Sequence, residues 1–139
     1  MFRTKMSDPD HPLNAGGLLL GRFLLASLFL VEGWGKMRGY AGAVGYMEKF
    51  GVPGALLPVV IFLEIAGGLA ILVGFQTQLV ALALAGFSVA AALIFHNNFA
   101  DRNQMLHFEK DLAIAGGFLM LFAFGPGAWS LDKRRSYRA

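Results

Sequence analysis

The feature that most constrains this chain is an uncharged apolar run, residues 55–75, that is broken by a single acid, Glu64. At about 1.5 Å of rise per residue, a helix of this length is long enough to cross a bilayer. A carboxylate near the middle of such a helix costs on the order of several kcal/mol if it faces lipid. Glu64 therefore needs a partner, a bound proton or a ligand inside the protein.

The composition extends this argument to the whole chain. Hydrophobic residues make up 56% of its 139 residues and charged residues only 15%, whereas a soluble domain carries about 25% charged residues. Three more apolar segments, residues 18–34, 79–95 and 112–131, resemble residues 55–75 in composition. The sequence therefore predicts an all-α membrane protein that folds as a four-helix transmembrane bundle.

The polar segments set the predicted domain limits and topology. Residues 1–16 are expected to form a polar N-terminal tail, residues 17–131 the four-helix domain, and residues 132–139 a basic C-terminal tail. Lysine and arginine are somewhat more frequent on the side that holds both tails, so we expect both termini in the cytoplasm. The segments 37–54 and 96–110 would then be outward-facing loops of a multi-pass protein of the bacterial inner membrane.

Two classes of function are excluded by composition. The net charge of +3 is not organised into a basic patch with interleaved aromatic residues, so we expect no nucleic-acid partner. The chain has no cysteine, which excludes cysteine-ligated iron–sulfur clusters and covalent haem attachment. Any redox group must therefore be bound without a covalent link.

The spacing of Glu64 predicts where its side chain points. Glu64 shares one helical face with Gly67 and Gly68, and small-residue faces let transmembrane helices approach closely. We therefore expect Glu64 to face the inside of the bundle. Two interpretations stay open there: a structural hydrogen-bond or ion-pair partner between helices, or a protonatable group that lines an internal site.

Other polar residues are predicted to gather around Glu64. Arg22 either reaches the cytoplasmic interface or faces inward, and Glu32 and Lys36 are spaced for an ion pair at the outer end of the first span. Together the outer polar residues predict a polar mouth above a buried acid; they are Glu32, Lys36, His96, His107, Glu109 and Asp111. A metal or haem held by His96 and His107 is disfavoured, since His107 is expected outside the hydrocarbon and axial ligands need a common depth.

Short glycine-rich motifs, in a fixed order from Gly17 to Asp132, resemble the DoxX family of membrane proteins. Their order and spacing carry the resemblance rather than any one motif. They are Gly21-Arg22 with Phe29, Gly33 and Lys36; Pro53 with Glu64, Gly67-Gly68 and Gly74; Phe95-His96; Lys110-Asp111 with Gly116-Gly117; and Gly125-Pro126-Gly127 with Ser130-Leu131-Asp132. Two departures from the family pattern, Glu32 and Asp111, add acids near the predicted mouth.

The resemblance implies a four-helix inner-membrane protein that is linked to quinone-dependent oxidoreduction, because related DoxD-type subunits belong to thiosulfate:quinone oxidoreductase. Quinone reduction needs an apolar slot and groups that supply protons. On this hypothesis Glu64 and His96 are the catalytic proton carriers. The quinone-binding residues would be Arg22, Phe29, Glu32, Lys36, Phe95, His107 and Asp111, with Trp34 and Phe108 as further candidates for the ring pocket.

Two other hypotheses remain. The chain is equally well explained as a non-catalytic membrane anchor or scaffold for a soluble oxidoreductase, with the glycine faces forming a homo-oligomer or partner contacts. A carrier of small molecules or ions is less favoured, because four helices in one chain are few and transport would need oligomers. Whether the protein is an enzyme stays open at this point.

Overall fold

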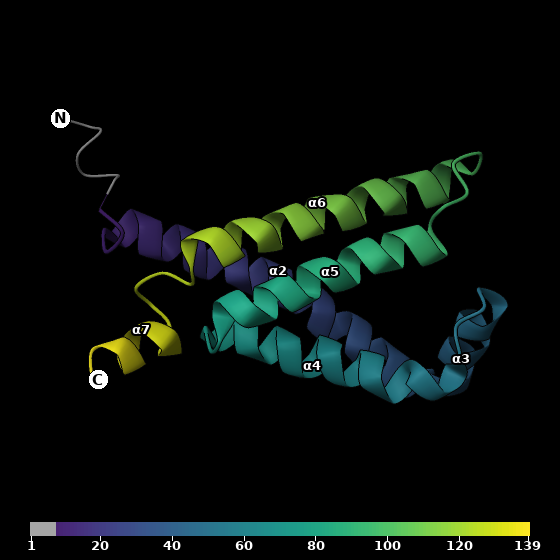
Figure 1. The fold of residues 1–139 in the computed structure, drawn as a ribbon, viewed down its shortest axis with the longest axis horizontal. Helices are drawn as coiled ribbons and strands as arrows, with labels where there is room; N and C mark the ends of the chain where they lie inside the picture. The colour runs from purple at the N-terminus through teal and green to yellow at the C-terminus, as the bar shows by residue number, and fades with distance from the viewer. Residues whose placement is uncertain (1–7) are drawn as a thin grey trace.

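A computed structural model describes residues 8–139 of the chain and shows a helical protein with no strand in that range (Figure 1). Residues 1–7 of the predicted N-terminal tail lie outside the described part. The elements are α2 (Pro12–Arg38), α3 (Tyr40–Lys49), the 3₁₀ turn η1 (Gly54–Leu56), α4 (Leu57–Val73), α5 (Thr77–Phe95), α6 (Arg102–Phe124) and α7 (Leu131–Ser136).

Several predicted tails and loops are helical in the structure. Helix α2 begins at Pro12, where the His11 side chain accepts from the Leu13 amide, so it starts inside the predicted N-terminal tail. Helix α7 occupies most of the predicted basic C-terminal tail. The predicted outward loop 37–54 contains α3, and the predicted loop 96–110 already contains the first two turns of α6.

The long helices pack as two pairs. Helix α2 lies along α4 and α5 lies along α6, while α4 and α5 connect the pairs (Figure 1). Glycines set the close approach of α2 and α4: a Cβ on Gly33 would lie 2.7 Å from the Ile65 side chain, and one on Gly68 would lie 3.0 Å from Leu30. A larger residue at either position would require Ile65 or Leu30 to move or the two helices to separate.

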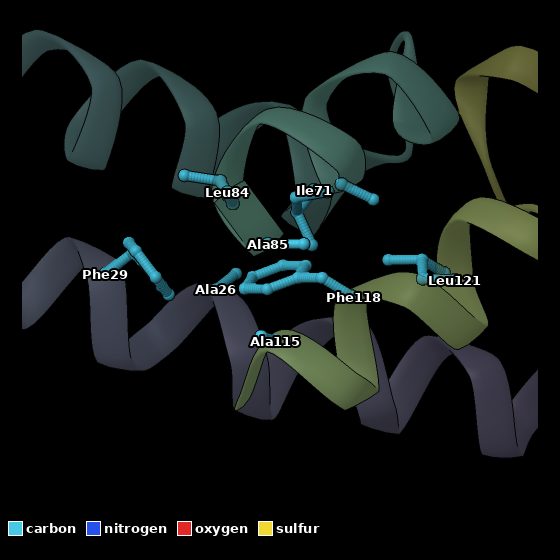
Figure 2. Close-up of a cluster of buried hydrophobic side chains, with 9 residues drawn as sticks. Ala26, Phe29, Ile71, Leu84, Ala85, Ala115, Phe118 and Leu121 are labelled. Carbon is cyan, nitrogen blue, oxygen red and sulfur yellow. The ribbon is translucent and has the colours of Figure 1, made fainter. Parts of the chain in front are cut away.

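An apolar core joins the two pairs at mid-length. Phe118 of α6 is fully buried and packs edge-on against Phe29 of α2, with ring centroids 5.4 Å apart. Figure 2 shows the Phe118 ring with Ala85 and Ile71 above it, Ala115 below it and Ala26 beside it. Beyond this core the pairs diverge towards the end that carries α3, opposite the end where α2 begins and α7 lies (Figure 1).

Three helical segments within residues 8–139 are long and apolar enough to cross a membrane: α2, Gly54–Val73 and α5. Helix α6 is also long but is charged at its start, with Arg102, Glu109, Lys110 and Asp111 in its first half and no charge from Leu112 to Phe124. Large apolar side chains cover the outer faces, as lipid contact requires. Examples are Phe62, Leu79 and Met120, which are 72%, 68% and 66% exposed.

At the end where α2 begins and α7 lies, Arg22 joins separate parts of the chain through hydrogen bonds. Its side chain is 1% exposed, and its guanidinium donates to the backbone oxygens of Pro126 (3.0 Å), Trp129 (2.8 Å) and Leu72 (3.4 Å). Gly74 ends α4 with a φ of +73°, and a Cβ there would collide with Ser130 and the Arg22 guanidinium. The segment after α6 is therefore fastened across the end of α4 by one buried cation.

Replacing Arg22 with glutamine should destabilise the protein strongly, because the shorter neutral side chain leaves buried carbonyl oxygens without a donor. Hydrogen bonds to a charged group are worth about 1.5–3 kcal/mol each, so we expect a loss of about 3 kcal/mol in the free energy of unfolding. Thermal unfolding in detergent checks this, with the exposed Arg135→Gln as the control. Equal stability of the two variants would contradict the closing role of Arg22.

Candidate functional site

A cavity of about 830 Å³ opens between the two helix pairs, at the end where they diverge. Its walls come from α2, α3, α4, α5 and α6, so all the long helices contribute. Cavities that bind small organic ligands typically measure about 300–1,000 Å³. The space is thus large enough for a ring system with part of a tail.

The inner polar group of the cavity is Glu64, whose side chain is 4% exposed. One of its oxygens, Oε1, lies 3.0 Å from Lys36 Nζ, and Lys36 Nζ also lies 3.4 Å from Glu32 Oε2. Exposure rises along this chain of charges, from 4% for Glu64 to 28% for Lys36 and 56% for Glu32. The three side chains therefore connect the depth of the cavity with its rim.

The second oxygen of Glu64, Oε2, is buried and has no hydrogen-bond partner among the described residues. Buried carboxylate oxygens are normally satisfied, since an unpaired one carries the full cost of lost hydration. Glu64 lines the cavity while this oxygen is itself covered by protein, so a small rotation of the carboxyl group would let it accept a hydrogen bond from a molecule bound there.

The sequence places Glu64 here through simple helix geometry. Glu64, Gly67 and Gly68 share the face of α4 that meets the rest of the protein, and all three are buried. The close contact at Gly33 of α2 brings Lys36, one turn further on, level with Glu64. The inward orientation of Glu64 is as predicted, and the Glu32–Lys36 pair is present. The Lys36–Glu64 contact was not predicted, although the glycines on the two facing helices are a signal for it.

The opposite wall of the cavity carries the histidines. His96 follows the last residue of α5, and its Nε2 lies 3.7 Å from Asp111 Oδ2 on α6. The ring of His107 stacks on the His96 ring, with centroids 5.0 Å apart. Burial lowers the pKa of His96 below its usual value, while Asp111 acts in the opposite direction and the neighbouring His107 and Lys110 lower it further. Histidine is the side chain whose ordinary pKa lies nearest to neutral pH, so His96 is a candidate for proton exchange in the cavity.

The histidine and carboxylate groups do not form a metal site in residues 8–139, where no three side chains of this kind converge on a common point. His96, His107 and Asp111 all line the cavity instead.

Aromatic rings supply the apolar part of the walls. Phe29 packs on Phe87 at the inner end, with centroids 6.1 Å apart, and Phe95 stacks on Tyr46 of α3 at 5.5 Å and 24°. All four rings line the cavity. Tyr46 and Phe87 were not among the predicted residues; Tyr46 was missed because its segment was taken for a loop.

Most of the predicted residues are brought together by the fold. The cavity is lined by the predicted residues Phe29, Glu32, Lys36, Glu64, Phe95, His96, His107 and Asp111. The other predictions need correction. Arg22 lies at the far end, bound to backbone oxygens, and it does not reach solvent either. Trp34 is 59% exposed and Phe108 packs on Phe99; neither lines the cavity.

Substitutions of Lys36 and Glu64 should have strongly non-additive effects on the free energy of unfolding. Lys36→Met leaves a buried carboxylate without its cation and should cost about 3 kcal/mol, whereas the double variant Lys36→Met/Glu64→Gln should regain most of that loss. Thermal unfolding of the four members of this double-mutant cycle measures the coupling. Glu32→Gln, at the exposed end of the same chain, is the control and should change stability by less than about 1 kcal/mol. Additive effects of the two substitutions would show that the pair is not formed.

Comparison with known proteins identifies a family and several inner-membrane relatives. The DoxX family model matches residues 17–97, and the SURF4 family model matches residues 58–137. The chain is 54% identical to the inner membrane protein YqjF of Escherichia coli (strain K12) over 117 residues, which cover 84% of this chain and 90% of that protein. It is 35% identical to the inner membrane protein YphA of the same organism over 124 residues, covering 84% and 89%.

A more distant relative is a membrane protein of Mycobacterium tuberculosis (strain ATCC 25618 / H37Rv), 30% identical over 158 aligned positions that cover 100% of this chain and 96% of the relative. No solved structure shows significant similarity to the chain. The relatives and the apolar helices make this a multi-pass protein of the inner membrane. The chain belongs to the DoxX family.

Proposed function

We propose that this protein binds a quinone in the cavity between its helix pairs and handles the protons of quinone oxidation and reduction. It would act as a quinone-linked oxidoreductase or as the membrane subunit of one. The observation that carries the proposal is the buried Glu64 carboxylate at the wall of a cavity with aromatic side chains: Lys36 holds one of its oxygens, and the other has no hydrogen-bond partner among residues 8–139.

The chemistry of quinones fits this arrangement. Reduction of a quinone to a hydroquinone takes up two electrons and two protons, one proton at each carbonyl oxygen. Glu64 on α4 and His96 at the end of α5 lie on opposite walls, so each is assigned to relaying one proton, which it takes up from solvent at the rim of the cavity and passes to a carbonyl oxygen. The Lys36 ammonium stabilises negative charge as it develops on the ring oxygen near Glu64. Phe29, Phe95 and Tyr46 provide flat apolar surfaces for the ring.

The electrons must come from outside this chain, because no side chain type in it carries two electrons reversibly: cysteine is absent. A soluble oxidoreductase partner is therefore part of the proposal. In this proposal the quinone is a substrate that enters the cavity from the bilayer.

The proposed topology is four transmembrane helices with both termini in the cytoplasm. Two observations support it: the start of α2 and the C-terminal helix α7 lie at the same end of the molecule (Figure 1), and α6 is uncharged from Leu112 to Phe124. The basic cluster Lys133-Arg134-Arg135 lies at that end, as the positive-inside rule requires of a cytoplasmic side. The cavity would then open towards the outer half of the membrane.

A second function, a non-catalytic anchor or scaffold, is favoured by one separate observation. Ala83, Gly86 and Ala90 form a small-residue face on α5 that is exposed, and a Cβ on Gly86 would meet nothing within 4 Å. Such a face suits a helix of a second copy or of a partner subunit. On this alternative the buried charges serve only the stability of the fold.

The quinone affinity of the Glu64→Gln variant, compared with that of the wild type, distinguishes a quinone-binding function from a scaffold function. Purified protein in nanodiscs would be titrated with ubiquinone and menaquinone analogues, and bound quinone measured after separation from the free ligand. Loss of a hydrogen bond to a charged group corresponds to about a tenfold or greater loss in affinity. The matched control is Glu109→Gln, an exposed acid on α6 that does not line the cavity and should bind as the wild type does.

Three outcomes would contradict the quinone hypothesis. The wild-type protein could fail to bind either analogue, or Glu64→Gln could bind as tightly as the wild type, or both Gln variants could lose affinity equally. If Glu64→Gln changed only thermal stability or association with other subunits, the scaffold function would be supported instead.

A further inference from the structure

The C-terminal helix α7 is fixed to the body of the protein rather than extending as a loose basic tail. Ser130 caps its first turn by accepting from the Lys133 amide at 3.2 Å. The Asp132 carboxylate accepts from the Gln76 and Thr77 amides, at 2.8 and 2.9 Å, where α5 begins. The turn between α4 and α5 therefore holds α7 in one position, and its side chains project from a defined surface.

Three arginines of this region are exposed and carry no compensating acid. Arg134, Arg135 and Arg138 form no ion pair with a carboxylate in the part of the chain that the structure describes. The acids nearby are already engaged: Asp10 lies 3.3 Å from Lys133, and Asp132 holds the start of α5. The arginines thus form a surface of net positive charge.

The opposite end of the molecule differs in charge. There the acids are Glu32, Glu48, Glu64, Asp101, Glu109 and Asp111, and the cations are Lys36, Arg38, Lys49, Arg102 and Lys110. Acids and cations nearly balance at that end, so the uncompensated positive charge is a property of the α7 end alone.

Exposed aromatic rings place the same surface at the edge of the membrane. Trp129 and Tyr137, just before and just after α7, are 54% and 74% exposed. The Arg135 guanidinium lies over the ring of Phe75, 5.6 Å from its centroid, at the turn where α4 ends and α5 begins. Tryptophan and tyrosine concentrate at the boundary between hydrocarbon and head groups. From these rings we expect the arginines at the depth of lipid phosphates.

We propose that Arg134, Arg135 and Arg138 form a binding surface for anionic phospholipid head groups, such as those of phosphatidylglycerol. A guanidinium matches the geometry of a phosphate with two parallel hydrogen bonds. Fixation of α7 lowers the entropy lost when these side chains engage lipid. The proposal does not depend on what the cavity binds.

The test is a lipid titration of the full-length protein in detergent, followed by native mass spectrometry. The probes are palmitoyl-oleoyl phosphatidylglycerol and the phosphatidylcholine with the same acyl chains. A cation near the surface is worth about a fivefold change in affinity for an anionic lipid. The wild-type protein should therefore prefer phosphatidylglycerol by about tenfold or more, and the Arg134→Gln/Arg135→Gln/Arg138→Gln variant should lose that preference.

Two controls separate this surface from a general effect of charge and from misfolding. The Arg38→Gln/Lys49→Gln/Arg102→Gln variant removes as many cations at the other end and should keep the preference. The lysine versions of the three α7 substitutions should keep most of it. Three results would overturn the proposal: no lipid preference in the wild type, a preference that survives the α7 glutamine variant, or equal losses in the two glutamine variants. An acidic soluble protein that binds these arginines while lipids show no preference would overturn it as well.

Discussion

The architecture depends on one buried cation, Arg22. Its guanidinium binds backbone oxygens at the end of α4 and in the segment that follows α6, so it joins the first helix to two distant parts of the chain. Asp132 completes the same junction by holding the start of α5. A neutral residue at position 22 could not satisfy these carbonyl oxygens together, and in a membrane no water is available to do so.

This junction explains why the cavity lies where it does. The Arg22 hydrogen bonds join the helix pairs at the end that carries α7, and Phe118 packs between the pairs at mid-length. Towards α3 the pairs diverge. The polar side chains that the diverging walls expose to one another are Glu64 and Lys36 on one side and His96 and Asp111 on the other. Apolar surfaces outside and titratable groups inside give the protein an internal cavity with polar and aromatic walls.

Sequence reasoning predicted the local part of this picture well. The inward orientation of Glu64 follows from its spacing to Gly67 and Gly68, which is a property of one helix. Predictions that depended on distant contacts failed. Arg22 was assigned to the site, but its hydrogen-bond acceptors lie up to 107 residues away in sequence, and no local pattern reveals them. Helix α3 was taken for a loop because its segment connects two apolar spans, and Tyr46 was missed with it.

The most direct test of the central claim is to observe the Glu64 carboxyl group during quinone reduction. Redox-triggered infrared difference spectroscopy, at saturating concentrations of a short-tailed ubiquinone analogue, reports changes in individual carboxyl groups. The account predicts a carboxyl band that shifts in deuterated water, disappears in Glu64→Gln and persists in Glu109→Gln. Identical difference spectra for the wild type and Glu64→Gln, with quinone bound in both, would contradict the proposed role of Glu64.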